Sequence, residues 1–327
     1  MSRARSAVRN AVEDVTVGAM MRAVTWLPAG VVLGCARALA LGVNVMLPAR
    51  RRHAQALVRE RLGPRVGEAS ASRIVEGAFR TLALNAVETL LVERALRRGT
   101  RPDELVTVEG AEHLRTALAG GRGALLCGAH LGAWELTPLL LSTWFTPIWV
   151  VARRLDNPRL ERRLAAHRGR FTRGSVAKEG GAPQLVRILR SGEAVGMLLD
   201  QNAGRGGVVM DFLGAPSSHH KVAGVLARRF RAPALPVYLL REPGNLRFRM
   251  RIEAPIEADP ALPAEEAERE VVARLSASLA AQVRAHPEQY LWLHDRWRHA
   301  QRAARLSARE AAARGSRLAV AQGTNGG

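Results

Sequence analysis

The sequence is poor in cysteine and in aromatic residues. Only two of its 327 residues are cysteines, Cys35 and Cys127. Two cysteines cannot build a disulfide framework, which favours a reducing compartment for the main domain. Aromatic residues make up 4% of the chain, which is a poor composition for a base-stacking surface. Because zinc-finger and RNA-recognition patterns are also absent from the sequence, we do not expect a nucleic-acid partner.

Acidic residues are scarce relative to basic ones. Asp and Glu number 29 against 49 Lys and Arg, which leaves a formal net charge of +20. An excess of this size points to an anionic partner, such as a phospholipid surface, lipid phosphates or an acidic carrier protein. A GC-rich genome, which favours arginine, would account for part of the excess.

No single uncharged run near the N-terminus is long enough to span a bilayer. Residues 23–36 and 38–49 are uncharged, and Arg37 separates them. A span needs about 20 apolar residues, so the two runs would have to join across Arg37. The basic residues 50–52 follow directly, as is typical of a cytoplasmic membrane surface. We expect residues 1–62 to form helices that anchor to the membrane or lie on it; buried helices and a cleaved signal sequence are the alternatives.

From residue 106 onward the sequence alternates between strand and helix patterns. This alternation predicts an α/β fold, a mostly parallel sheet flanked by helices, within one catalytic domain of residues 63–299. Residues 300–327 are rich in Ala and Arg and are expected to form a basic, disordered tail. The expected strands are residues 106–108, 123–127, 147–153, 194–199, 234–240 and 247–252, the last as an edge strand; the expected helices are residues 70–98, 111–119, 132–144, 157–171, 184–190, 221–230 and 264–285.

His130 lies just beyond a buried apolar run, residues 123–127. In an open parallel sheet, ligands bind beyond the carboxyl ends of the strands. Glu135 follows five residues later and could reach the imidazole if His130 lies in the loop and Glu135 in the first helical turn. A carboxylate on one ring nitrogen raises the basicity of the other, so His130 could accept a proton from an alcohol. The alternative is a structural histidine at a strand end.

Other catalytic patterns are absent from the sequence. It contains no Gly-x-Ser-x-Gly, no His-Glu-x-x-His and no Gly-x-x-x-x-Gly-Lys, which argues against those hydrolase, metalloprotease and nucleotide sites. Cys127 lies within an apolar run and is expected in the core. The remaining histidines lack metal-ligand spacing. We therefore expect neither a metal nor a bound cofactor.

Residues 129–136 (AHLGAWEL) resemble the His-x4-Asp/Glu motif of the lipid A biosynthesis acyltransferases, the late lauroyl and myristoyl acyltransferases within the lysophospholipid acyltransferase superfamily. Each block of the resemblance is weak alone, but six occur in order. Ala133 and Asn202 depart from the family pattern, which puts the acceptor rather than the reaction class in question. The other five blocks are residues 153–158 (RRLDNP), 200–204 (DQNAG), 212–216 (FLGAP), 232–237 (APALPV) and 292–297 (WLHDRW).

The resemblance implies an inner-membrane enzyme with its active site on the cytoplasmic side. It implies an acyl carrier protein or coenzyme A thioester as acyl donor and a hydroxyl of a lipid A precursor or similar glycolipid as acceptor. His130 carries over as general base and Glu135 as its partner. The residues that carry over as lining the site or binding substrate are Arg153, Asn157, Arg170, Asp200 and Gln201.

Two other functions fit the same sequence. Phosphatidylinositol mannoside acyltransferases share the His-x4-acid motif, so an inositol mannoside or a lysophospholipid could be the acceptor. A non-catalytic, basic membrane-surface protein on this fold is a further alternative, against which the intact pair of His130 and Glu135 argues.

Overall fold

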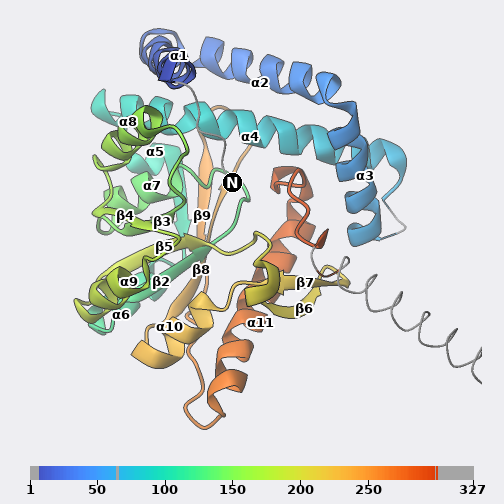
Figure 1. The fold of residues 1–327 in the computed structure, drawn as a ribbon. Helices are drawn as coiled ribbons and strands as arrows, with labels where there is room; N and C mark the ends of the chain where they lie inside the picture. The colour runs from blue at the N-terminus through green and yellow to red at the C-terminus, as the bar shows by residue number, and fades with distance from the viewer. Residues whose placement is uncertain (1–6, 64–65, 299, 301–327) are drawn as a thin grey trace, which may run out of the picture.

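The core of the protein is a seven-stranded sheet, seen in a computed structural model that describes residues 7–63, 66–298 and 300. The strand order is β1-β9-β8-β2-β5-β3-β4 (Figure 1). All neighbouring pairs are parallel except β8 with β9, which confirms the predicted fold class. The strands are β1 (Val106–Glu109), β2 (Ala124–Gly128), β3 (Trp149–Ala152), β4 (Gly174–Ala177), β5 (Ala194–Leu198), β8 (Ala234–Arg241) and β9 (Phe248–Ile252).

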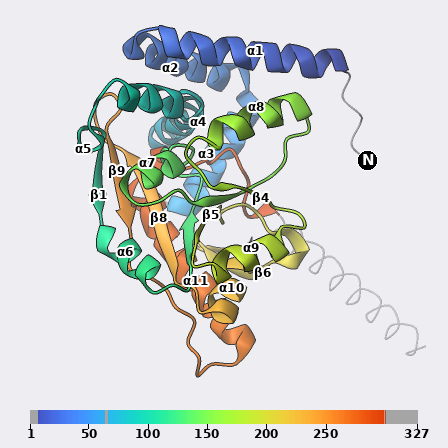
Figure 2. The same cartoon turned by 90° about the vertical axis from the view of Figure 1, so that its left-hand side faces the viewer.

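Helices cover both faces of this sheet (Figure 2). The alternation of side chains along β2 shows why its sequence is apolar throughout: Leu126 joins one core cluster with α4, α6 and α7, whereas Leu125 and Cys127 join another with α9, α10 and α11. A parallel strand buried on both faces needs apolar residues at every position. The helices of this layer are α4 (Glu68–Arg97), α5 (Pro102–Leu105), α6 (Ala111–Ala119), α7 (Thr137–Trp144), α8 (Pro158–Arg168), α9 (Ala182–Arg190), α10 (Val222–Phe230) and α11 (Ala264–Ala285), followed by the short η2 (Pro287–Gln289).

The edge-strand prediction for residues 247–252 is wrong. β9 lies inside the sheet, because the short β1 pairs with its outer side. Arg249 suggested a solvent-facing edge, but its guanidinium forms ion pairs with Glu109 of β1 and Glu242. Neutralised by these carboxylates, an arginine can occupy an interior strand.

A small antiparallel hairpin stands apart from the main sheet and was not predicted. It joins β6 (Val208–Phe212) to β7 (Ala215–His219). Its two turn residues, Leu213 and Gly214, have φ of 53° and 77°, as a two-residue hairpin turn requires. β4 was also missed by the sequence patterns, and the short 3-10 turn η1 (Gly204–Gly206) leads into the hairpin.

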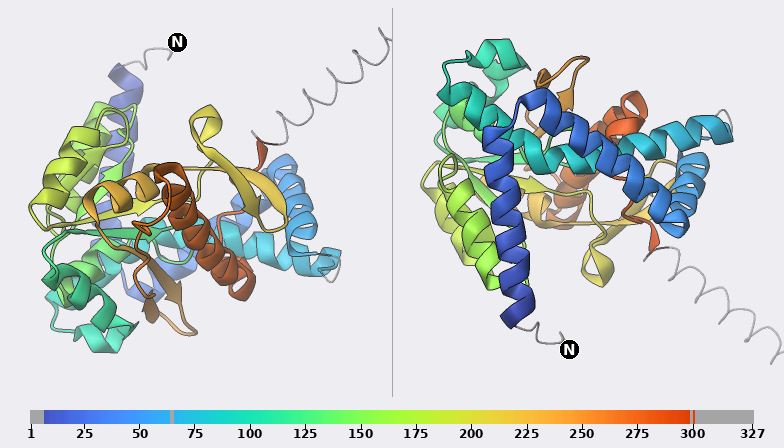
Figure 3. Two further views of the ribbon diagram at one scale, coloured as in Figure 1. Left: turned by 90° about the horizontal axis from the view of Figure 1, so that it is seen from below. Right: turned by 90° about the horizontal axis from the view of Figure 1, so that it is seen from above.

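Three N-terminal helices lie on the outer side of α4: α1 (Ala7–Trp26), α2 (Ala29–Met46) and α3 (Pro48–Leu62). The right-hand view of Figure 3 shows α1 and α2 lying across this side of the molecule. α2 packs along α4 through a shared core that includes Val32, Leu33 and Leu84. Within the described ranges, α2 is the one helix long and apolar enough to cross a membrane by length and composition. The predicted tail, residues 300–327, lies outside the described residues apart from Ala300.

The outward faces of α1 and α2 are apolar and exposed. Trp26, at the end of α1, is 85% exposed. A soluble surface rarely gathers so many large apolar side chains in one place. We call this set the outer apolar face; its exposed large members are Val8, Val12, Val15, Met20, Trp26, Leu27, Val31, Leu39, Leu41, Val45 and Met46.

A buried ion pair fixes α4 to the sheet. Glu88 of α4 is 4% exposed, and Arg241 of β8 binds both of its carboxylate oxygens, with Nε–Oε1 2.8 Å and Nη2–Oε2 2.6 Å. The Gln289 amide in turn accepts from the Arg241 backbone N–H at 2.9 Å and donates to its carbonyl at 3.0 Å. α4, β8 and η2 therefore form one rigid unit.

Replacing Arg241 by Met should destabilise the fold strongly, because it leaves the buried Glu88 carboxylate without its partner. We expect a loss of about 3–5 kcal/mol in the free energy of unfolding, measured by urea denaturation. The double variant Glu88→Leu/Arg241→Met should recover most of this loss. Arg251→Met, whose half-exposed side chain lies 4.0 Å from Glu253, is the matched control and should change stability by less than about 1 kcal/mol. Equal losses in the single and double variants would contradict the assignment.

Candidate active site

His130 and Asp200 meet at the carboxyl ends of two neighbouring strands. β2 and β5 are paired in parallel with Gly128 opposite Leu198. His130 and Asp200 each follow two residues later, so the register brings them together. The Nδ1 atom of His130 lies 2.8 Å from Oδ1 of Asp200.

Burial and charge act in opposite directions on this pair. Burial alone lowers the pKa of His130, but the adjacent Asp200 carboxylate outweighs burial, so the pKa lies above the ordinary histidine value. Burial likewise raises the pKa of Asp200, yet His130 and the charge of Arg296 bring it below the ordinary value. Asp200 is therefore ionised at neutral pH and holds the Nδ1 side of the ring.

The carboxylate that binds the His130 ring is thus Asp200 and not Glu135, which corrects the predicted geometry. Glu135 lies in the turn before α7, with its side chain 45% exposed and 3.5 Å from Nη2 of Arg168. Its charge still raises the pKa of His130, less than that of Asp200 does. The ring of Trp134 packs edge-on against His130, with centroids 5.3 Å apart.

The loop after β2 approaches the backbone of β8 so closely that only glycine fits at Gly132. Its φ is +64°, and a Cβ there would lie 2.0 Å from the carbonyl oxygen of Leu239. The N–H of Gly132 donates to Gln289 at 3.0 Å, and that of Ala133 donates to Leu239 at 2.7 Å. The loop that carries His130 is therefore fixed by distant parts of the chain.

Asn85 of α4 binds the same loop at two points, and the sequence patterns did not identify it. Its Nδ2 donates to the carbonyl of Gly132 at 2.9 Å and to that of Thr81 at 2.9 Å, and its Oδ1 accepts from the N–H of Glu135 at 3.1 Å. Asn85 is 5% exposed. A polar residue among the apolar positions of a predicted helix was the available signal.

The closing block, residues 292–297, supports the site from the other side. The N–H of Leu291 donates to the carbonyl of His130 at 3.0 Å, and Nε1 of Trp297 donates to the carbonyl of Phe212 at 2.9 Å. The Arg296 side chain is 2% exposed, and its guanidinium carbon lies 4.0 Å from the centroid of the Phe212 ring. These contacts attach the C-terminal segment to the hairpin and to the loop that carries His130.

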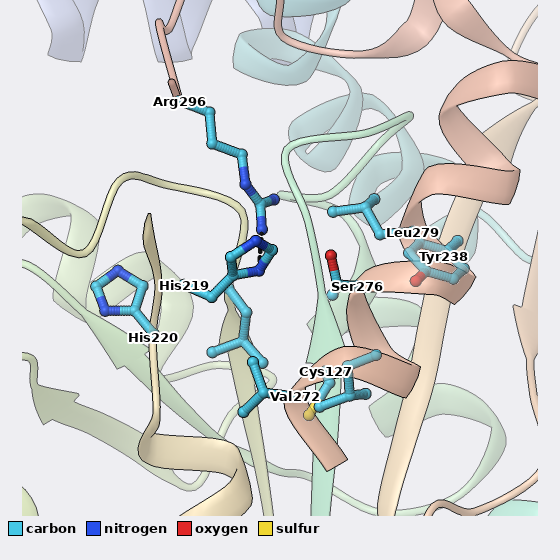
Figure 4. A pocket seen from close by; sticks show the side chains of 11 residues that line it. Cys127, His219, His220, Tyr238, Val272, Ser276, Leu279 and Arg296 are labelled. Carbon is cyan, nitrogen blue, oxygen red and sulfur yellow. Dashed lines mark hydrogen bonds between the residues drawn. The ribbon is translucent and has the colours of Figure 1, made fainter. Parts of the chain in front are cut away.

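Arg296 also borders a small buried cavity of about 30 Å³. Figure 4 shows its guanidinium reaching His219, where Nη2 lies 2.8 Å from Nδ1 of the imidazole. Burial and, after it, the charge of Arg296 together lower the pKa of His219 to about 3, so His219 is neutral. Ser276 and Cys127 line the other side of the cavity. Cys127 is 3% exposed, which confirms its predicted place in the core, and burial raises its pKa to about 12.

His130 opens onto a larger pocket of about 440 Å³. Most of its walls are apolar, as a hydrocarbon chain would require. Gln201 lies beside the ring, with its Nε2 atom 3.5 Å from Nε2 of His130. Among the lining residues are the basic side chains Arg153, Arg168 and Lys178 and the apolar side chains Leu141, Ile148, Phe171, Met197 and Leu199.

Two of the predicted site residues lie elsewhere. Asn157 is buried and caps α8, where its Oδ1 accepts from the N–H of Arg159 at 3.0 Å, while its Nδ2 donates to Asn10 of α1. Arg170 lies away from the pocket and contacts Glu93 at 3.2 Å. Arg153 and Gln201 do line the pocket, whereas Arg168 and Lys178 were not predicted. Within the described ranges, no group of three or more His, Cys, Asp or Glu side chains could hold a metal ion.

The known proteins to which this chain is similar are acyltransferases. The model of the bacterial lipid A biosynthesis acyltransferase family matches residues 3–299. The chain is 25% identical to a lipid A biosynthesis palmitoleoyltransferase of Escherichia coli over 228 residues, 69% of this chain and 72% of the relative. It is 27% identical to a phosphatidylinositol mannoside acyltransferase of Mycobacterium tuberculosis over 195 residues, 58% and 59% of the two chains.

Among solved structures, the crystal structure of PlsC, the 1-acyl-sn-glycerophosphate acyltransferase of Thermotoga maritima, is similar with a TM-score of 0.34 and 15% identity. The match covers 72% of this chain and 98% of that protein.

Substitution of Asn85 by Leu should loosen the loop that carries His130, because the Gly132 carbonyl and the Glu135 N–H lose their bonds to Asn85. We expect the free energy of unfolding to fall by roughly 2–4 kcal/mol in urea denaturation. Thr89→Val is the matched control: Thr89 is also buried on α4, but its hydroxyl has no hydrogen-bond partner in the described part of the chain, so stability should not fall. A small change for Asn85→Leu would show that the loop is held without it.

The His130–Asp200 pair predicts the direction of a titration shift. In the wild type, the imidazole of His130 should titrate above pH 6.5, the ordinary histidine value. Asp200→Asn removes the charge that stabilises the imidazolium, so the pKa should move to lower pH. NMR titration of the histidine ring signals measures both values, with His130→Gln used to assign the signal. An unchanged pKa in Asp200→Asn would refute the pairing.

Proposed function

Since the chain belongs to the bacterial lipid A biosynthesis acyltransferase family, we propose that it transfers a fatty acyl chain from an acyl carrier protein or coenzyme A thioester to a hydroxyl of a lipid A precursor or similar glycolipid. The observation that supports this most directly is the His130–Asp200 pair at the mouth of an apolar pocket with a basic rim. An acyl chain, a hydroxyl group and lipid phosphates are the features that such a site accommodates.

In this mechanism His130 acts as the general base. Its Nδ1–H donates to Asp200, which leaves the lone pair on Nε2. The acceptor hydroxyl would replace the long 3.5 Å contact that Gln201 makes with Nε2 and give its proton to that nitrogen. The hydroxyl oxygen attacks the thioester carbonyl carbon, and the carbonyl π electrons move to its oxygen. When this intermediate collapses, the C–S bond breaks and the leaving sulfur takes the proton from Nε2 of His130. The products are an ester and a free thiol.

Glu135 has a supporting role in this proposal. Its carboxylate adds negative charge near His130, which favours the imidazolium formed during the attack. It also contacts Arg168 at the rim of the pocket. A guanidinium held there could bind a phosphate of either substrate in the bidentate manner that suits arginine. Arg153 and Lys178 would add to the same attraction.

We propose that the enzyme docks on the cytoplasmic side of the inner membrane through its outer apolar face. One side of α2 packs against α4, so lipid could not surround this helix as it would a spanning segment. α2 would instead lie in the plane of the interface with its exposed side in the acyl layer, as amphipathic helices do. The basic residues 50–52 follow at the end of this face and would meet anionic headgroups.

An inositol mannoside is the second candidate acceptor. It is favoured by the similarity to the Mycobacterium tuberculosis phosphatidylinositol mannoside acyltransferase. The same base and the same apolar pocket would serve this reaction, because only the acceptor part of the substrate differs.

Acyl transfer from a labelled acyl-carrier thioester to a Kdo-containing lipid A precursor, in detergent, tests the proposal. His130→Ala should lower the rate by about 10²–10⁴-fold, since a general base contributes that much. The same change removes the partner of the buried Asp200 carboxylate, so some thermal stability is lost and rates are compared at a temperature where circular dichroism shows the variant folded. Glu135→Gln should lower the rate less, without loss of stability. His113→Gln, on α6 and outside the pocket, is the control and should behave as the wild type.

Wild-type turnover by His130→Ala would overturn the general-base assignment. An unchanged rate in Glu135→Gln would show that the Glu135 carboxylate does not contribute to the reaction. If the wild type transfers nothing to the lipid A precursor, inositol mannosides and lysophospholipids are the next acceptors to assay, and turnover with either would replace the glycolipid part of the proposal.

A further inference from the structure

We infer that a second pocket, between α1 and α8 and separate from the catalytic one, binds the phosphate of an anionic membrane lipid. This inference rests on the proposed membrane docking. We call the site the arginine pocket; it has a volume of about 560 Å³ and is lined by Asp14, Met21, Arg159, Arg162, Arg163, Ala166, His167 and Arg170.

The arginines gather in this pocket because of their spacing on α8. Arg159, Arg162, Arg163 and Arg170 recur at intervals of three, four and seven residues, which places them on one face of a helix and its immediate continuation. Arg168 lies on a different face and lines the catalytic pocket. A single helix therefore supplies basic side chains to two pockets.

The charges of the arginine pocket are only partly compensated. Arg163 binds Asp14 of α1 through two bonds of 2.7 and 3.0 Å. Arg170 contacts Glu93, a carboxylate that His167 and Arg97 also contact.

Arg159 and Arg162 complete the wall of the pocket. Neither has a carboxylate within 4.0 Å among the residues that the structure describes. Both are exposed, and both act on Asp14 only through their charge, lowering its pKa after the larger effect of its hydrogen bond to Arg163. Two guanidinium groups are thus available to an incoming anion.

His167 adds no positive charge to this site. Burial lowers its pKa, although the contact with Glu93 partly opposes this. Four arginines and one lining carboxylate leave a net positive wall. The planar guanidinium matches the oxygen atoms of a phosphate, which favours a phosphate group as the ligand.

The position of the pocket beside α1 favours a membrane lipid as the molecule that carries this phosphate. α1 and α8 lie side by side, as Figures 2 and 3 show from two directions. The exposed residues Val8, Val12 and Val15 recur on the outward side of the same α1 that contributes Asp14 and Met21 to the pocket. When the outer apolar face enters the acyl layer, the flank of α1 would meet the headgroup phosphates.

An acidic carrier protein is a less suitable occupant. To reach Arg159 and Arg162 it would have to approach beside the apolar side chains of α1, which the bilayer would cover in the docked enzyme. The lipid would hold α8 at the membrane, and through Arg168 the same helix would hold one wall of the catalytic pocket near the lipid substrate.

Flotation of the full-length protein with vesicles tests the inference. Vesicles of phosphatidylcholine alone are compared with vesicles that also contain phosphatidylglycerol. For Arg159→Gln/Arg162→Gln we expect the partition coefficient on the anionic vesicles to fall by about 30-fold, since each basic side chain near an anionic surface contributes about fivefold. Partition on pure phosphatidylcholine should stay at the wild-type level.

Two controls separate the pocket from general charge and from docking. Arg269→Gln/Arg274→Gln removes two charges from α11, whose N-terminal end lies at the opposite end of the molecule from α1 (Figure 1), and should cost much less on anionic vesicles. Val12→Asp/Val15→Asp disrupts the outer apolar face and should weaken binding to both kinds of vesicle.

Each outcome has a distinct meaning. Equal losses in the two arginine pairs would overturn the pocket, because net charge alone would then explain binding. If Arg159→Gln/Arg162→Gln binds anionic vesicles as the wild type does but raises the KM for the acyl-carrier thioester, the pocket takes the carrier protein instead, and the inference fails. Wild-type binding by Val12→Asp/Val15→Asp would refute the proposed docking face itself.

Discussion

The site depends on one constraint: a loop buried in the protein must find a partner for every backbone N–H and C=O group. Residues 129–136 are neither strand nor regular helix, so only a few of their partners lie within the loop and the others come from elsewhere in the chain. Asn85, Leu239, Gln289 and Leu291 provide them. An unpaired buried group costs free energy, so this arrangement of the loop is favoured over others. The same bonds therefore fix the position of the His130 ring.

The fold class and the position of His130 at the ligand-binding edge of the sheet could be predicted because local sequence patterns indicate both. A continuous apolar run marks a doubly buried strand, and a polar residue directly after it marks the ligand-binding edge. The partner of the imidazole was assigned to Glu135 because it is close in sequence. Asp200 is 70 residues away, and only the register of β2 against β5 brings it to the ring. Pairing between distant strands has no local signature.

The misplaced element boundaries have an equally physical origin. A helix starting at residue 132 would place Pro138 in its interior, where proline removes a hydrogen bond and collides with the preceding turn. α7 instead begins at Thr137, so that Pro138 falls in the first turn, where proline is tolerated. The loop thereby gains the length that it needs to carry His130 outward. Arg249 of β9 was misread for a different reason, since its neutralising carboxylates come from β1 and from the loop after β8.

The attachment of the C-terminal segment to the loop that carries His130 affects the order in which the protein folds during its synthesis. During synthesis, residues 85, 130 and 200 leave the ribosome well before residues 289–297, whose bonds complete the loop. The parallel sheet and its helices can begin to assemble as they emerge, but the His130 loop lacks its last hydrogen-bond partners until nearly the whole domain has been made. The loop that carries His130 would therefore reach its final conformation only after residues 289–297 have left the ribosome.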